Sequence, residues 1–157
     1  MRLTPSLGLV AALALGATLA SAGGHSDPNA AAVKARQAHM TLYSHNLGPL
    51  GGMARGNMDY DADVAQAAAD NLAALATMSQ AGYWLPGTDS DSVEGSRALA
   101  AIWEEGSTAG DIGAQLAEAA VALQGEAGNG LEALQAAIGP VGQSCGACHD
   151  DYRLSDS

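Results

Sequence analysis

The sequence contains no phenylalanine and few aromatic residues of any kind, with four tyrosines and two tryptophans among 157 residues. Aromatic side chains bury about 150–250 Å² each and supply much of the core of many small domains. Alanine and glycine dominate the non-polar positions instead. The helices or strands must therefore pack with their backbones close together, or the interior must hold a group that the sequence does not encode.

Basic residues are also scarce, since six Lys and Arg stand against 17 Asp and Glu and give a formal net charge of −11. Proteins that bind nucleic acid or anionic lipid need clustered Lys and Arg to displace counterions. The basic residues of this chain are scattered along the sequence. We therefore expect no nucleic acid and no membrane surface as partner.

Long apolar runs are absent, except for a short one near the beginning of the chain. Arg2, the apolar stretch 7–20 and the small residues up to Ala22 form the pattern of a signal peptide cleaved after Ala22. Removing residues 1–22, which include Arg2, leaves five basic and 17 acidic side chains, a net charge of −12. We expect a periplasmic protein that is not membrane-bound, with one domain over 23–157.

Apolar residues recur at three- and four-residue steps in four segments, which predicts four helices. Asp27-Pro28 and Asp61 are helix-start signals, and the region of Gly106 and Gly110 weakens the third segment. No segment shows the alternation of a β-strand. The sequence predicts an all-α, antiparallel four-helix bundle, with helices at about 28–55, 61–82, 99–123 and 130–154 and a long loop at 82–96.

The two cysteines of the chain form a C-x-x-C-H motif with the next histidine: Cys145, Cys148 and His149. This motif is typical of covalent haem attachment. On a helix the three side chains share one face, so both thiols can bond the vinyl groups of one haem, with His149 as the proximal ligand of the iron. One covalently attached haem c would also supply the missing aromatic bulk.

Other interpretations of the cysteines remain open. Export permits a disulfide between them, in a haemless helical module that acts as a binding protein. A thioredoxin-like redox pair would need a βαβ context. A zinc site would need further ligands, which His25, His39 and His45 do not offer as a second paired motif; we interpret all three as surface histidines. No catalytic constellation is recognisable, so we do not expect an enzyme.

The C-terminal motif, the sequence RQAHM in the first helix and Ile102-Trp103 in the third segment resemble the class II cytochromes c, which comprise cytochrome c′ and its low-spin relatives. The resemblance covers essentially the whole chain after residue 22. It implies a four-helix bundle with haem near one end and a homodimer formed through the first two helices. Two departures are local: a customary phenylalanine of the third helix is absent, and the loop before that helix is longer and more acidic.

The resemblance also implies roles for individual residues. Cys145 and Cys148 match the cysteines that bind haem, and His149 matches the proximal ligand. Further haem contacts are implied near the propionates and on the proximal side, by Arg36, Gln37, Arg97, Tyr152 and Arg153.

Met40, one helical turn after Arg36, matches the position over the distal face of the haem. A thioether ligand favours Fe(II), raises the potential and keeps the coordination constant, which suits a carrier of single electrons. If Met40 only packs over the haem, the iron is five-coordinate and high-spin and binds NO or CO. Met53, Met58 and Met78 are poorer candidates. The acidic charge predicts redox partners with basic docking surfaces.

Overall fold

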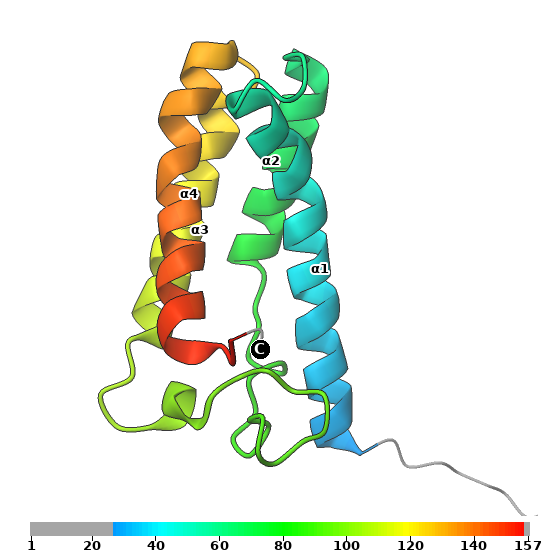
Figure 1. Ribbon diagram of the computed structural model, residues 1–157, viewed down its shortest axis with the longest axis vertical. Helices are drawn as coiled ribbons and strands as arrows, with labels where there is room; N and C mark the ends of the chain where they lie inside the picture. Colours follow the sequence, from blue (N-terminus) through cyan, green and yellow to red (C-terminus); the bar gives the residue numbers. More distant parts are fainter. Residues whose placement is uncertain (1–26, 156–157) are drawn as a thin grey trace, which may run out of the picture.

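The computed structural model describes residues 27–155, which form four α-helices and one short 3₁₀ helix (Figure 1). Successive α-helices run in opposite directions and make the antiparallel bundle that the sequence predicts. No strand occurs within 27–155, and the predicted signal peptide lies outside these residues. The elements are α1 (Pro28–Ala54), α2 (Ala62–Thr77), the 3₁₀ helix η1 (Ala100–Trp103), α3 (Ala109–Glu126) and α4 (Leu131–Tyr152).

Polar caps fix the beginnings of the first two helices where the sequence predicts them. The side chain of Asp27 accepts a hydrogen bond from the Asn29 N–H at 2.9 Å, and that of Asp61 accepts one from the Val64 N–H at 3.0 Å. An aspartate at this position satisfies an N–H group that has no partner within its helix. Gly130, with a φ of +119°, precedes α4.

The prediction of one continuous third helix over 99–123 is wrong in its first half. Residues 100–103 form one 3₁₀ turn, and α3 begins only at Ala109. Gly106 has a φ of +86°, a conformation that no helix contains. The second helix also ends earlier than its predicted limit at Gly82, because Met78 is already extended, with a ψ of 139°.

Small residues fill much of the bundle core, as the absence of phenylalanine requires. The largest fully buried side chains are aliphatic, and they come from all four α-helices: Leu50, Met53, Leu72, Leu123, Leu134 and Val141. The inward face of α2 carries Ala65, Ala68, Ala69 and Ala73 beside Leu72. Alanines on this face let α2 lie close to its neighbours, so close backbone packing replaces aromatic bulk.

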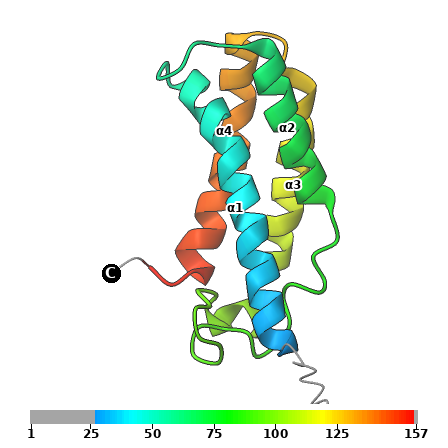
Figure 2. The same cartoon turned by 90° about the vertical axis from the view of Figure 1, so that its right-hand side faces the viewer.

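One end of the bundle gathers segments that are far apart in the sequence. The start of α1, the end of α4, η1 and the long loop between α2 and η1 all lie there (Figures 1 and 2). Of the adjacent helix pairs, α1 and α4 make the least contact with each other. Within the described residues, no helix has both the length and the hydropathy of a membrane span.

Candidate functional site

The last two turns of α4 carry the C-x-x-C-H motif. Cys145 and Cys148 are half-buried free thiols, so the disulfide considered above is not formed in this structure. Burial raises the pKa of both thiols, and the neighbouring Cys145 and Asp151 raise that of Cys148 further. The two groups are therefore protonated thiols at neutral pH, one turn apart on one helix.

His149 completes the motif on the same face of α4. Partial burial lowers the pKa of its imidazole, and the positive charges of Arg153 and Arg97 lower it further, against the opposing charge of Asp150. A lowered pKa keeps the ring neutral at pH 7, and the neutral imidazole is the form that binds metal ions.

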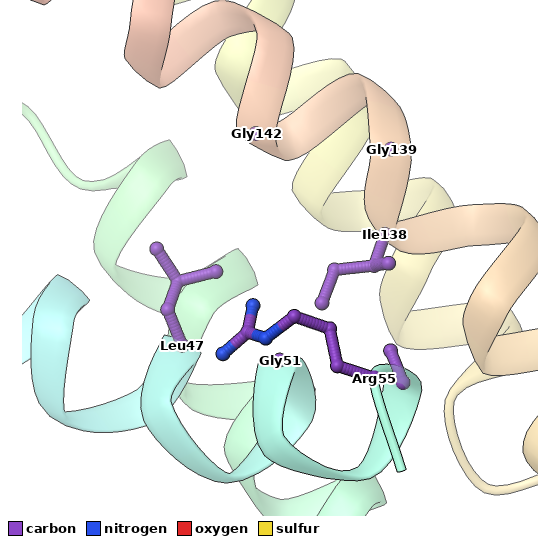
Figure 3. Close-up of a pocket in the computed structure, with 7 residues that line it drawn as sticks. Leu47, Gly51, Arg55, Ile138, Gly139 and Gly142 are labelled. Carbon is purple, nitrogen blue, oxygen red and sulfur yellow. The ribbon is translucent and has the colours of Figure 1, made fainter. Parts of the chain in front are cut away.

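A half-open cleft of about 350 Å³ separates α1 from α4 (Figure 3). Gly139 and Gly142 contribute no side chains to its α4 wall, where the side chain of Ile138 lines the cleft. On the other wall, the Arg55 guanidinium lies over Gly51, where a Cβ atom would come within 2.9 Å of Arg55 Nη1. Leu47, Ala54 and Ile138 complete the lining.

The helical register extends this cleft toward the haem motif. Residues seven apart lie on one face, two turns away, so Met40 shares the face of Leu47, and Cys145 shares that of Ile138. Because α1 and α4 run antiparallel, both steps lead toward the same end of the bundle (Figure 1). Met40 and the motif therefore occupy facing stripes of the two helices, and Met40 is 37% exposed there.

Two residues of α1 close to Met40, His39 and Tyr43, are buried, and only the burial of His39 contradicts the prediction from the sequence. His39, predicted to be a surface residue, is only 3% exposed, and that prediction is wrong; His45 is exposed as predicted, whereas His25 lies outside the described residues. The ring of His39 lies 4.7 Å from that of Tyr43. His39, Tyr43, Asn46 and Leu50 are spaced three or four residues apart, as on the buried face of a helix. This spacing is the sequence signal that indicates burial of His39.

Tyr43 of this buried stripe lies near Cys145 of the haem motif. Burial raises its pKa to about 12, the nearby Gln80 side chain lowers it, and the charge of Cys145 raises it. The Tyr43 hydroxyl and His39 Nε2 are buried and have no hydrogen-bond partner within the described part of the chain. Polar atoms of this kind require an explanation such as a bound group or water. Buried polar atoms on α1 without partners among residues 27–155, facing the helix that carries two thiols and a neutral imidazole, fit a site for haem c.

The residues expected at the propionates bind a loop instead. The Arg36 guanidinium is 5% exposed and donates four hydrogen bonds to neutral acceptors of residues 83–96. Gln37 Nε2 donates to the Gly95 carbonyl at 2.7 Å. These bonds occupy both terminal nitrogens of Arg36 and leave only its Nε–H group for another acceptor, so a two-pronged propionate contact is not available in this conformation.

The residues expected on the proximal side join the end of α4 to other segments. The Tyr152 hydroxyl accepts a hydrogen bond from the Thr108 N–H at 2.9 Å. Arg153 forms a β-bridge with Ala98, and Arg97 Nη2 donates to the Leu154 carbonyl at 2.5 Å. All three residues thus lie close to the motif in the fold. Their contacts with haem stay predictions.

The fold and the motif together define a class of protein, a four-helix bundle that attaches haem through its last helix. The family model described as Cytochrome C′ matches residues 31–153. The chain is 41% identical over 122 residues to a cytochrome c′ of Cereibacter sphaeroides, covering 78% of this chain and 82% of that protein. It is also 41% identical over 124 residues to cytochrome c-554 of the same organism, covering 79% and 81%.

A solved cytochrome c′ described as from Rhodobacter Spheriodes has the same architecture, with a TM-score of 0.79 and 39% identity over 83% of this chain and 100% of that one. The chain belongs to the cytochrome c′ family. Members of this family are class II c-type cytochromes that carry covalently attached haem c, and the two cysteines of this chain agree with that mode of attachment.

Proposed function

We propose that this protein carries single electrons in the periplasm. Cys145 and Cys148 would hold haem c through thioether bonds, His149 would be the proximal ligand, and Met40 the distal ligand. The haem, when bound, supplies the one-electron couple. The protein would supply two cysteines as fixed points of attachment and two ligands on facing helices. Arg97, Tyr152 and Arg153 would line the proximal side.

The register of Met40 is the observation that carries this proposal. The residue lies on the α4-facing stripe of α1, opposite the turn of α4 that contains His149, in the helix pair that makes the least contact of the adjacent pairs. A thioether at this position would keep six ligands on the iron in both redox states. Constant coordination means little rearrangement when an electron arrives or leaves, which favours rapid transfer.

Absorption and electron paramagnetic resonance spectra of the purified protein test the proposal. Haem should resist acid–acetone extraction, and ferric wild type should be low-spin with a methionine–iron charge-transfer band. Met40→Ala should convert the ferric iron to high-spin and admit CO, whereas Met58→Ala, which changes an exposed methionine distant from the motif, should not. A high-spin wild type would refute the electron-carrier proposal, and extractable haem would refute the attachment.

A second candidate function is the binding of NO or CO. Met40 is more exposed than the side chains of the buried stripe, which suits a residue that moves aside for a ligand. One solved relative, a cytochrome c prime variant of Alcaligenes xylosoxidans that is 32% identical to this chain, was determined as its nitric oxide complex. Rapid CO uptake by ferrous wild type, together with a high-spin ferric spectrum, would favour this function.

The proposed redox partners have basic docking surfaces. Exposed carboxylates surround the end of the bundle that holds the motif: Asp91, Glu94, Glu104, Glu105, Asp150 and Asp151. Attraction to a basic partner is screened by salt, so electron exchange should slow as the ionic strength rises from 0.01 to about 0.15 M. Rates that rise with salt would contradict this partner class.

We also propose that the protein forms a homodimer. A cytochrome c′ with 27% identity and a TM-score of 0.73 undergoes ligand-controlled dimer dissociation. Sedimentation of the haem-loaded protein, with and without CO, tests both the dimer and its response to a ligand.

A further inference from the structure

The loop segment 83–98, which we call the strap, crosses the end of the bundle that holds the haem motif (Figure 2). From Tyr83 to Ser96 it is bonded to Arg36 of α1. Arg36 Nη1 donates to the Tyr83 carbonyl at 3.2 Å and to Thr88 Oγ1 at 3.1 Å. Arg36 Nη2 donates to the Thr88 carbonyl and to Ser96 Oγ, both at 2.9 Å. One side chain thus joins three separated positions of the strap.

At its C-terminal end, at Arg97 and Ala98, the strap is bonded to the residues that follow the haem motif. The Leu154 N–H donates to the Arg97 carbonyl at 2.8 Å. The Leu99 N–H, just beyond the strap, donates to the Tyr152 carbonyl at 2.9 Å. Ala98 and Arg153 form an antiparallel bridge between these bonds. The strap therefore connects α1 to α4, the two adjacent helices with the least direct contact.

Burying the charged guanidinium of Arg36 costs free energy. All four of its acceptors are neutral, and burial lowers its pKa because the charged form loses solvation. In some proteins a buried charged group fixes one conformation that apolar residues would not specify. Trp84 covers the guanidinium at 4.6 Å from its ring centroid, so Arg36 acts as the core around which the strap folds.

We propose that Arg36, through the strap, is a positioning residue that fixes the spacing between Met40 on α1 and His149 on α4. Arg36 lies one turn from Met40. The C-terminal end of the strap and the adjacent Leu99 are bonded to residues 152–154, which lie three to five residues after His149. The inference rests on the proposed function insofar as it assigns these two residues to opposite faces of the haem. It differs from the propionate role expected for Arg36, because its acceptors lie in the protein.

Arg36→Lys tests this role in the haem-loaded protein, with Arg55→Lys as the matched control, since Arg55 is an exposed arginine directly after α1, away from the strap. A lysine keeps the charge but its single nitrogen cannot reach all four acceptors. Hydrogen exchange of strap amides, such as those of Ser90 and Ser96, should accelerate by about tenfold or more in Arg36→Lys. The control should exchange like wild type.

The same variant should bind CO to ferrous haem about tenfold faster, because a loosened α1 releases the distal position more often. Unchanged exchange in the strap would overturn the proposal. Faster exchange with an unchanged CO rate would overturn the positioning step. A shifted haem potential with wild-type exchange would assign Arg36 to a propionate instead. Both rates are measurable whether ferric wild type is low-spin or high-spin, so failure of the electron-carrier proposal is distinguishable.

Thr88→Val and Thr88→Ser decide the question if Arg36→Lys does not fold. Valine has nearly the size of threonine but lacks Oγ1, which accepts from Arg36 and donates to the Leu85 carbonyl at 2.6 Å. Serine keeps that atom. Thr88→Val should accelerate both strap exchange and CO binding, and Thr88→Ser should leave both near wild type. Equal rates for the two variants would contradict a strap held through this hydroxyl.

Discussion

The Tyr60 hydroxyl bridges two connections of the bundle at the end opposite the haem motif. It donates a hydrogen bond to the Ala127 carbonyl at 2.8 Å and accepts one from the Gly130 N–H at 2.9 Å. Tyr60 thereby ties the segment before α2 to the turn between α3 and α4. Tyr60→Phe keeps the ring and removes only these two bonds, so its effect can be worked out from the structure.

The expected loss follows from what each partner becomes when the hydroxyl is removed. A hydrogen bond contributes a net 0.5–1.5 kcal/mol or so, and a buried group left without a partner costs about 1–3 kcal/mol. Ala127 is fully buried, so its carbonyl stays without a replacement, whereas Gly130 is only half-buried. We expect Tyr60→Phe to lower the free energy of unfolding by about 2–3 kcal/mol.

Urea unfolding of the haem-loaded protein, followed by far-ultraviolet circular dichroism, measures this loss. Asn129→Ala is the matched control, because the Asn129 amide makes an exposed bond to the Gly125 carbonyl at 2.9 Å in the same turn. It should cost less than about 1 kcal/mol. The haem spectrum should not change in either variant. A loss from Tyr60→Phe no larger than that from Asn129→Ala would refute the reasoning.

Four further substitutions test other parts of the bundle by the same unfolding assay. Leu123→Ala empties a fully buried site and should cost about 2–5 kcal/mol; a smaller loss would mean that the core collapses around the alanine. Asp61→Ala removes the cap on Val64 and should cost about 1 kcal/mol. Gly130→Ala forces a side chain onto a φ of +119° and should cost about 1–3 kcal/mol, whereas Gly113→Ala, inside α3 with open space around it, should be neutral or stabilising.

The sequence predicts those elements whose signals are local. Asp27-Pro28 and Asp61 predict two helix starts, and both aspartates cap helices in the structure. The C-x-x-C-H spacing likewise lies within one helical turn. The sequence predicts that the third helix is weakened near Gly106 but not that it is divided in two. A glycine lowers helix propensity without revealing whether its φ will be positive. Gly106 has that positive φ, and the chain forms a 3₁₀ turn and a separate helix.

The contacts of Arg36 illustrate what sequence reasoning misses. Its acceptors are two backbone carbonyls and two hydroxyls, 47 to 60 residues away. Their positions depend on the conformation of a loop with no periodic pattern, so no spacing in the sequence identifies them. His39 was missed for a related reason, since a polar residue on a helix predicts exposure until its neighbours on other elements are known.

The shortage of aromatic residues has two different consequences at the two ends of the bundle. Where α2 presents alanines to its neighbours, the helices approach closely and the core closes around Leu50, Leu72 and Leu123. α1 and α4 make the least contact of the adjacent helix pairs, and toward the other end Tyr43 and His39 have buried polar atoms without hydrogen-bond partners among the described residues. Small residues alone cannot close that space, which is why the strap and the proposed haem both belong at the same end of the molecule.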